Sequence, residues 1–314
     1  MKIGFFGTPE IASYSLTALS REHEIVFAVT CLDKPQGRSQ KVCTTPVKTC
    51  ADDNCIALLQ TENLKDPDFI NELKCFNADI FVVVAFGYII PESIFKMPRL
   101  GTVNLHPSLL PKYRGAAPVQ WALINGENET GVTIQMVDEK LDSGDIVLQE
   151  KIPVSDEMNS STLYDVILPL GADMLLKAVK GLDDGSIKPV PQNHEEATYC
   201  RKIDKAAALI NWSNSAGQIH NLVRGLNPKP AAWTEFRDKN MKIWKTRIFD
   251  ESADIKLMPG ELMKFSRKRL LAGTGEGIIE ILELQPENKK IMDALSFING
   301  SRLAEKEFFK LFPE

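Results

Sequence analysis

The sequence has 314 residues, and its 44% hydrophobic and 25% charged content, without low-complexity tracts, excludes a disordered chain and fits a folded protein of two domains. No hydrophobic run reaches the length of a membrane span, and the opening MKIGFFGTPE contains Gly, Pro and Glu too early for a signal peptide, so we expect a cytoplasmic protein. The net charge of −5 argues against a protein that binds nucleic acid over its whole surface.

The first half of the chain alternates strand-like and helix-like segments, which predicts an α/β domain with a parallel-rich sheet and crossover helices. The expected strands are KIGFF (2–6), EIVFAVT (24–30), DIFVVVAF (79–86) and TVNLH (102–106). The expected helices run from Pro9 to about Ser20 with Thr8 as the N-cap, onward from Pro46, over 66–74 and around 117–125. After these we expect a hairpin-like pair of outer strands, 132–138 and 145–154, and a long amphipathic helix over roughly 161–180.

Beyond about residue 204 the pattern changes to short strands separated by Gly, Asn and Pro, with no helix between them: AAWTEF, MKIWKTRIF, GELMKF, RLLAGT and GIIEILEL. This pattern predicts a smaller all-β domain, either a barrel or a sandwich. The polar, Pro-containing segment KPVPQNHEEA places the boundary near residues 190–205. We therefore expect an N-terminal domain over 1–200 and a C-terminal domain over 205–314.

The charges are unevenly distributed along the chain. Residues 1–200 carry 17 Lys and Arg against 27 Asp and Glu, whereas residues 201–314 carry 20 against 15. A second basic stretch, which contains no acid, holds Lys34, Arg38, Lys41 and Lys48. Both features favour a polyanionic partner, although a solvated surface loop is a simpler explanation of the second.

The sequence lacks the patterns of metal and dinucleotide sites. Its six cysteines form no CxxC and have no His at zinc-finger spacing, so we expect reduced thiols and no metal. Gly4 and Gly7 lie between the first strand and helix, but their spacing is not that of GxGxxG and no Walker lysine follows. A tight turn explains these two glycines best.

The strand TVNLH carries the strongest indication of a site. Side chains two positions apart in a strand point the same way, so Asn104 and His106 share a face. Pro107 and Ser108 then end the strand at what would be the carboxyl edge of the sheet, where open parallel sheets bind their ligands. An amide, an imidazole and a carboxylate brought in from elsewhere could converge there on one reacting carbonyl. The turn LDSGD offers Asp142 and Asp145 as candidates, but acidic turn residues usually only bond their own backbone, and spacing alone favours neither.

These residues lie in the string NLHPSLLPKYRGAAPVQWALINGENETGVTIQMVDEKLDSGDI, which closely resembles the folate-dependent formyltransferases. The FGTPE start, the LDKPQGRSQKVCTTPVK loop and the NPKPAAWT segment resemble the member family that formylates methionyl-tRNA. The resemblance implies a Rossmann-like formyltransferase domain followed by a smaller, OB-fold-like barrel. It also implies 10-formyltetrahydrofolate as formyl donor and initiator methionyl-tRNA as acceptor, in translation initiation. Nothing in the sequence demands more than a monomer.

The same resemblance implies roles for individual residues. It assigns catalysis to Asn104, His106 and Asp142. It places the basic loop against the tRNA acceptor end, with Arg38 at the position of the family's arginine, and thereby makes Lys34, Arg38, Lys41 and Lys48 candidate tRNA contacts. The candidate folate contacts are Ala85, Phe86, Gly87, Ile89, Ser108, Leu109, Leu110, Pro111 and Asp138.

The implied reaction is attack of a primary amine on a formyl carbon. Asn104 and a ring N–H of His106 would donate to the developing oxyanion, and Asp142 would keep the imidazole protonated and oriented. Whether protons move directly or through water stays open. One alternative is a formyltransferase acting on an amino-sugar nucleotide, which would not need the cationic loop; another is a non-catalytic RNA-binding protein on the same scaffold.

Overall fold

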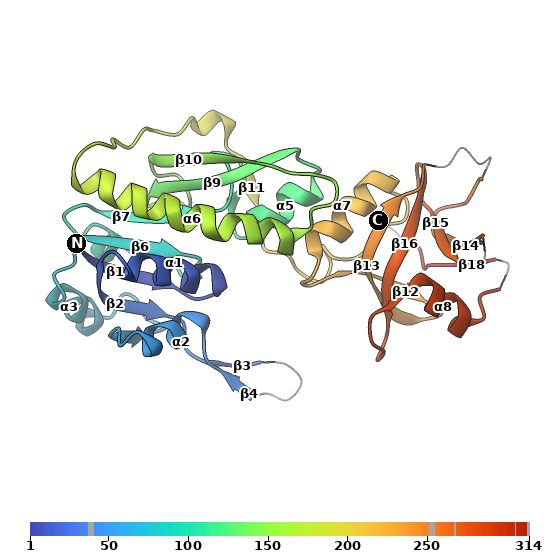
Figure 1. Cartoon of the computed structure of the whole chain (residues 1–314), viewed down its shortest axis with the longest axis horizontal. Coiled ribbons are helices and arrows are strands. Elements are labelled where there is room, and N and C mark those ends of the chain that lie inside the picture. The colour runs from blue at the N-terminus through green and yellow to red at the C-terminus, as the bar shows by residue number, and fades with distance from the viewer. Residues whose placement is uncertain (37–40, 251–254, 267, 305, 313–314) are drawn as a thin grey trace. The chain divides into compact units, whose positions relative to one another are not determined.

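The computed structural model describes residues 1–36, 41–250, 255–266, 268–304 and 306–312, and the chain forms two compact units (Figure 1). The first unit comprises Met1–Gly115, Thr130–Pro153 and Asp165–Cys200, and the second comprises Ala116–Glu129, Val154–Tyr164 and Arg201–Glu314. Two short segments from the N-terminal half therefore pack with the C-terminal unit, an arrangement that residue patterns did not indicate. Within the described residues, no helix is both long and apolar enough to cross a membrane.

The first unit is built on a seven-stranded sheet with the strand order β10-β9-β7-β6-β1-β2-β5. The strands β5, β2, β1, β6 and β7 pair in parallel, and β9 pairs antiparallel to β7. The predicted α/β class with a parallel-rich sheet is thus confirmed. The strands are β1 (Lys2–Gly7), β2 (Glu24–Thr30), β5 (Leu58–Gln60), β6 (Ile80–Val84), β7 (Thr102–His106), β9 (Glu129–Met136) and β10 (Ile146–Pro153).

The helices around this sheet begin where the sequence supplies caps. Thr45 accepts the Lys48 N–H at the start of one helix, Asp66 accepts the Asp68 N–H at the start of another, and a proline follows each cap. The expectation that Thr8 caps the first helix was wrong, because Pro9 is the N-cap and makes no side-chain bond. The helices are α1 (Glu10–Ser20), α2 (Pro46–Asp53), α3 (Pro67–Cys75), α4 (Glu92–Phe95) and α6 (Ser160–Asp183).

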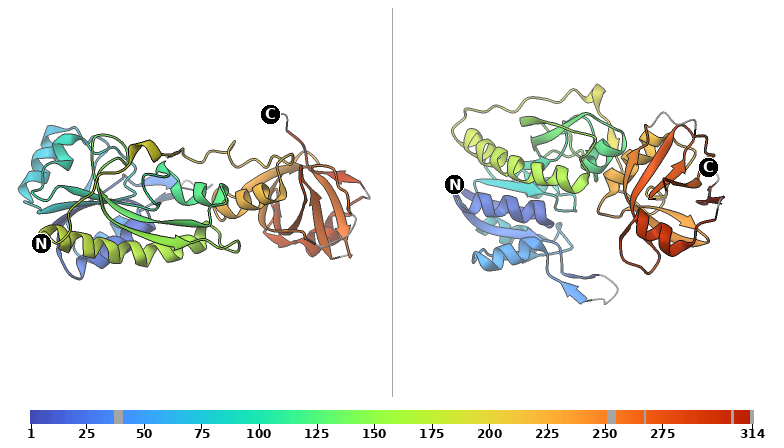
Figure 2. Two further views of the ribbon diagram at one scale, coloured as in Figure 1. Left: turned by 90° about the horizontal axis from the view of Figure 1, so that it is seen from above. Right: turned by 45° about the vertical axis from the view of Figure 1, so that its right-hand side comes forward.

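Helices cover both faces of the sheet. The side of β7 that packs against α6 determines on which face Asn104 and His106 lie. On one face, Phe6 and Phe81 form an aromatic cluster beneath α3 and α4. On the other face, a Cβ at Gly171 of α6 would lie 2.6 Å from Leu105 Cδ1, so α6 approaches β7 closely there. Figure 2 shows α3 and α6 on opposite sides of the sheet. Because neighbours in a strand alternate, Asn104 and His106 point away from α6.

The second unit contains an antiparallel sheet with the order β12-β13-β16-β15-β14-β18, and β17 pairs with β16. A bridge between Phe236 and Phe309 joins the first strand of this order to the segment after the last, so the sheet nearly closes on itself. The predicted small barrel-like domain is thus confirmed. Its strands are β12 (Ala232–Phe236), β13 (Lys239–Ile248), β14 (Glu261–Phe265), β15 (Arg269–Gly273), β16 (Ile278–Pro286), β17 (Met292–Asp293) and β18 (Glu307–Phe308).

Two further helices of this unit were not predicted. They are α7 (Ala216–Leu226) and α8 (Ala294–Ser301), and the unit also contains the expected α5 (Pro118–Ile124). A sequence signal for α7 existed, because Ser215 and Gln218 form a reciprocal capping box ahead of an apolar stripe.

Glu280 of β16 offers a test of how the second unit is held together. The side chain is 4% exposed and accepts hydrogen bonds from Arg269 and Arg247. Burial raises its pKa, but the bonds from Arg269 and Arg247 outweigh burial and leave the pKa below its ordinary value of 4.5. The ionised carboxylate therefore stabilises the folded unit above pH 4.5, and this contribution is lost as pH falls through the lower, folded-state pKa.

Glu280→Gln should lower the free energy of unfolding at pH 7 by about 1.5 to 3 kcal/mol, the usual contribution of hydrogen bonds to a charged group. The gap between wild type and variant should shrink as pH falls below 4.5. Urea unfolding followed by tryptophan fluorescence measures this, since all four tryptophans (121, 212, 233 and 244) belong to the second unit. A gap that stays constant down to acid pH would contradict the assignment.

Candidate active site

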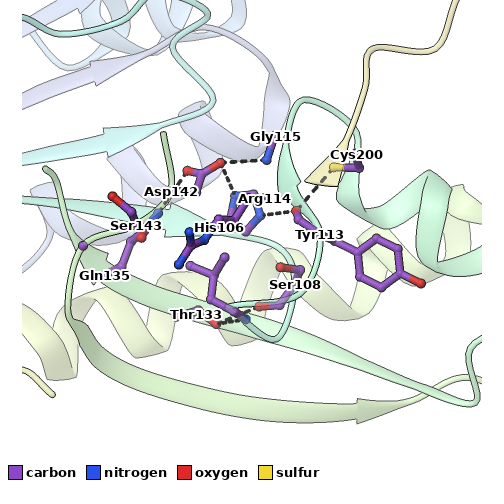
Figure 3. Close-up of polar contacts among 12 residues, drawn as sticks. His106, Ser108, Tyr113, Arg114, Gly115, Thr133, Gln135, Asp142, Ser143 and Cys200 are labelled. Carbon is purple, nitrogen blue, oxygen red and sulfur yellow. Dashed lines mark hydrogen bonds and ion pairs between the residues drawn. The ribbon is translucent and has the colours of Figure 1, made fainter. Parts of the chain in front are cut away.

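The end of β7 brings His106 against the acidic turn. Its side chain is buried, and Nε2 lies 2.9 Å from the main-chain oxygen of Tyr113. A carbonyl can only accept, so Nε2 carries a proton and donates it there. The other ring nitrogen, Nδ1, lies 3.7 Å from Oδ2 of Asp142, which is an ion-pair distance rather than a hydrogen bond (Figure 3). The geometry thus leaves Nδ1 as the ring nitrogen that is free for chemistry.

Asp142 is held on both carboxylate oxygens. Oδ1 accepts from Nε2 of Gln135 at 3.0 Å, and Oδ2 accepts from the main-chain N–H of Gly115 at 2.8 Å (Figure 3). Its backbone is left-handed, with φ of 51°, a conformation that Asp tolerates better than most residues. Gly115 is required where it stands, because a Cβ there would lie 2.2 Å from the main-chain oxygen of Cys200.

Asn104 supplies an unused amide on the same face. It is half-buried, it lies beside Gln135 in the β7–β9 ladder, and two positions further along β7 is His106. Its side chain makes no hydrogen bond to any residue that the structure describes. The amide is therefore available to a bound molecule, next to the imidazole and the carboxylate that the fold has brought together.

The candidate folate contacts that follow β6 form a loop at the carboxyl edge of the sheet. Ala85 and Gly87 are exposed and left-handed, with φ of 46° and 90°. Ile89 is 82% exposed, so its apolar side chain is open to a bound molecule. Phe86 differs from these three, since it is buried, with 2% of its surface exposed.

Phe86 anchors this loop to the two neighbouring strands. Its main-chain oxygen accepts from the Thr8 hydroxyl at 3.2 Å and from the Cys31 thiol at 3.3 Å. The Thr8 side chain thus bonds the loop after β6 and not the first turn of α1. These hydrogen bonds hold together the segments that follow β1, β2 and β6.

The remaining candidate folate contacts differ in how accessible they are. Ser108 and Leu110 are buried, and the Ser108 hydroxyl donates to a main-chain oxygen four residues onward. Leu109 and Pro111 are half-buried, and the peptide bond before Pro111 is cis. Asp138 is exposed and accepts the N–H of the following residue. In this segment Ser108 and Leu110 shape the loop, while Leu109, Pro111 and Asp138 have atoms open to a ligand.

The basic loop forms a β-hairpin. β3 (Lys34–Gln36) and β4 (Lys41–Cys43) pair antiparallel (Figure 1). Lys34 pairs with Cys43 at the open end of the hairpin, Lys41 pairs with Gln36 at its other end, and Arg38 lies outside the described residues.

Lys48, the fourth predicted tRNA contact, is already paired. Its Nζ lies 2.6 Å from Asp33 Oδ2 and 3.4 Å from Gln60 Oε1. The hydrogen bond from Lys48 lowers the pKa of Asp33 below its ordinary value. We therefore treat Lys48 as a residue that fixes the base of the hairpin rather than as an open cation.

Four buried residues with polar side chains around the LDSGD turn were not predicted from the sequence: Tyr113, Arg114, Gln135 and Gln192. Gln135 had a detectable signal, because it is a polar residue within an apolar strand and directly opposite Asn104. Gln192 had none, because it lies in the segment interpreted as a linker. Neither position could be tied to Asp142 without the fold.

The thiols and acids supply no evident metal site. None of the six cysteines, all within the described residues, forms a disulfide, and Cys200 is the buried one. Over the described part of the chain, no group of three or more His, Cys, Asp and Glu side chains is placed to hold a metal ion.

Comparison with known proteins gives two family matches and close relatives. The formyl transferase family matches residues 1–179, and the formyl transferase C-terminal domain matches residues 202–302. The chain is 41% identical over 308 residues to the methionyl-tRNA formyltransferase of Acetivibrio thermocellus, which covers 98% of this chain and 99% of that protein. It is 45% identical over 302 residues to that of Thermodesulfovibrio yellowstonii, with 96% of each chain covered.

Solved structures show the same fold at lower identity. The sugar 3N-formyl transferase WlaRD has a TM-score of 0.66 at 23% identity and covers 92% of this chain and 99% of its own. HypX from Aquifex aeolicus, in complex with tetrahydrofolic acid, has a TM-score of 0.64 at 17% identity and covers all of this chain with 52% of its own.

The fold and the two family matches define a formyl transferase, an enzyme class that moves a one-carbon formyl group. At 41 to 45% identity over nearly its whole length, the chain belongs to the methionyl-tRNA formyltransferase family.

Proposed function

We propose that the chain transfers the formyl group of 10-formyltetrahydrofolate to the α-amino group of initiator methionyl-tRNA. The relatives at 41 and 45% identity carry the name of this reaction. The observation that carries the proposal is the meeting of His106 Nδ1 with Asp142 beside the unused amide of Asn104. We expect the enzyme to act in the cytoplasm, where tRNAs are charged, and as a monomer.

The oxyanion receives two donors in this scheme. When the amine attacks the formyl carbon, negative charge develops on the formyl oxygen, and the Asn104 amide donates to it. The second donor is Nδ1–H of His106, because Nε2–H is committed to Tyr113. The Asp142 carboxylate lies 3.7 Å from Nδ1 and orients the ring for this role. Removal of one such donor typically costs about 2.7 to 4 kcal/mol of barrier.

His106 and Asp142 together handle the two proton transfers of the reaction. The attacking amine forms a C–N bond and releases a proton, which Asp142 accepts. The bond from the formyl carbon to N10 of the folate breaks, and that nitrogen takes a proton from His106. The proton on Asp142 then returns to Nδ1 of His106, which at 3.7 Å requires a bridging water or a closer approach of the two side chains, and the pair ends as it began.

The substrates are assigned to different parts of the first and second units. The exposed main chain at Ala85 and Gly87, with the exposed Ile89, offers a surface for the pteridine at the carboxyl edge of the sheet. The basic stretch with Lys34, Arg38 and Lys41, and residues 201–314 with 20 Lys and Arg against 15 Asp and Glu, supply cationic charge for the tRNA. Residues 1–200 and 205–314 are accordingly proposed as the catalytic and tRNA-contacting domains.

The hairpin assignment predicts a selective effect of Arg38→Ala. The KM for methionyl-tRNA should rise by about tenfold and the salt dependence of tRNA binding should weaken by about one charge, because one phosphate contact is lost. The KM for the folate should not change. Lys74→Ala, an exposed cation on α3, is the matched control and should leave both constants alone. If Arg38→Ala leaves the KM for methionyl-tRNA and the salt dependence of tRNA binding unchanged, the loop does not contact the tRNA and is only a solvated surface loop.

The function itself is tested by offering two acceptors to the purified protein. With 10-formyltetrahydrofolate as donor, methionyl-tRNA should be formylated, and a dTDP-linked amino sugar should not. Formylation of the amino sugar alone would overturn the proposal in favour of a sugar formyltransferase. Folate binding without transfer to either acceptor would indicate a binding protein instead.

A further inference from the structure

Three buried polar side chains that the proposed mechanism does not use form a hydrogen-bonded chain that ends on Asp142. The Arg114 guanidinium donates to Gln192 Oε1 at 2.7 Å, Gln192 Nε2 donates to Gln135 Oε1 at 3.2 Å, and Gln135 Nε2 donates to Asp142 Oδ1 at 3.0 Å. Every bond points in the same direction, from the cation to the carboxylate. Arg114, Gln135 and Asp142 are labelled in Figure 3.

The side chains of this hydrogen-bonded network are buried. Arg114, Gln135 and Gln192 are 4%, 2% and 5% exposed. No carboxylate of a described residue pairs directly with Arg114, whose other acceptor is Nδ1 of His194. Burying a guanidinium without a counter-ion costs free energy. Aligned amides inside a protein polarise one another, so the two glutamines connect the charge of Arg114 to the carboxylate of Asp142.

The same amides also fix the backbone of the turn. Besides Gln135, Gln192 Nε2 reaches the main-chain oxygens of Asp142 at 3.0 Å and Gly144 at 2.7 Å. Asp142 is left-handed at this point, a conformation that needs support from its surroundings. Gln192 therefore supports the turn while Gln135 holds the carboxylate by Oδ1. The opposite oxygen, Oδ2, is then the one that faces His106.

We infer that Gln135 and Gln192 are positioning residues that hold the Asp142 carboxylate at Nδ1 of His106 and connect it to the buried charge of Arg114. This inference rests on the proposed function, because it assigns the two amides a role in formyl transfer. It also gives the segment after α6 a part in the active site, although residue patterns indicate only a linker there.

Two replacements of Gln135 separate positioning from simple packing. Gln135→Met removes the donor at similar volume, so kcat should fall about 10- to 100-fold, the effect of misplacing a catalytic group. Both KM values and the thermal unfolding midpoint should change little. Gln192→Met removes the support one step further away and should lower kcat in the same way. Gln120→Met, which removes an amide that bonds Tyr164 outside this network, is the control and should keep wild-type kcat.

Gln135→Glu supplies a readout that a packing role would not move. A protonated glutamic acid can donate to Asp142 as the amide does, whereas an ionised one repels it. The ratio of variant to wild-type kcat should therefore rise as pH falls, while the ratio for Gln135→Met stays flat. A flat ratio for both variants, or wild-type kcat in Gln135→Met, would overturn the inference. A wild-type protein that forms no formyl-methionyl-tRNA would instead overturn the proposed function.

Discussion

Asp142→Asn is expected to lower the rate of formyl transfer by about 10²- to 10⁴-fold, the range for loss of an acid–base group. Asparagine keeps the shape and can still accept the Gly115 N–H, so the turn should survive. It loses the negative charge that lies 3.7 Å from His106, and it cannot take a proton from the amine. Single-turnover formylation at saturating folate and methionyl-tRNA measures this rate directly.

A control for Asp142→Asn lies in the same turn. Asp145 is exposed, and its side chain makes no bond to any described residue, so Asp145→Asn should keep the wild-type rate. The unfolding midpoints of both variants should match that of the wild type. A rate for Asp142→Asn within a few-fold of wild type would remove Asp142 from the mechanism.

Asn104→Ala is expected to lower kcat by about 10²- to 10³-fold, as for the loss of an oxyanion donor in other acyl-transfer enzymes. The amide has no hydrogen-bond partner among the described residues, so its removal should not destabilise the fold. The KM for the folate should change much less than kcat, since the interaction forms chiefly as charge develops. Steady-state kinetics with circular dichroism melting gives all three quantities.

Asn104→Asp tests the same role with a negative charge at this position. The new carboxylate would face a developing negative charge, so this variant should be slower than Asn104→Ala. An Asn104→Ala variant with near-normal kcat, or an Asn104→Asp variant faster than it, would show that Asn104 does not touch the oxyanion.

Local pattern was enough to predict the strands and the face of the site. The apolar run at β6 and the alternation at β7 follow from side-chain burial along single strands, and the shared face of Asn104 and His106 follows from the two-residue period. Apolar patterning likewise predicted β12 to β16 of the second unit, but not the two-residue strands β17 and β18. These properties depend on neighbours in the chain.

Properties that depend on distant partners were not predictable. The proton on His106 Nε2 is decided by a carbonyl of Tyr113 in the following loop. The charge of Lys48 is balanced by Asp33, just outside the basic stretch as the sequence delimits it. The hydroxyl of Thr8 is diverted to Phe86, 78 positions onward. Nothing in the residues near each of these indicates its partner.

A double-mutant cycle on His106 and Asp142 tests most directly whether the two side chains act as one unit on the formyl carbon. Single-turnover formyl transfer would be measured for His106→Ala, for Asp142→Ala and for the double variant, with folding checked by melting. The double variant should be about as slow as the slower single variant, because either change disables the same proton pathway. If instead the two losses in rate multiply, His106 and Asp142 act independently and the proposed pairing is wrong.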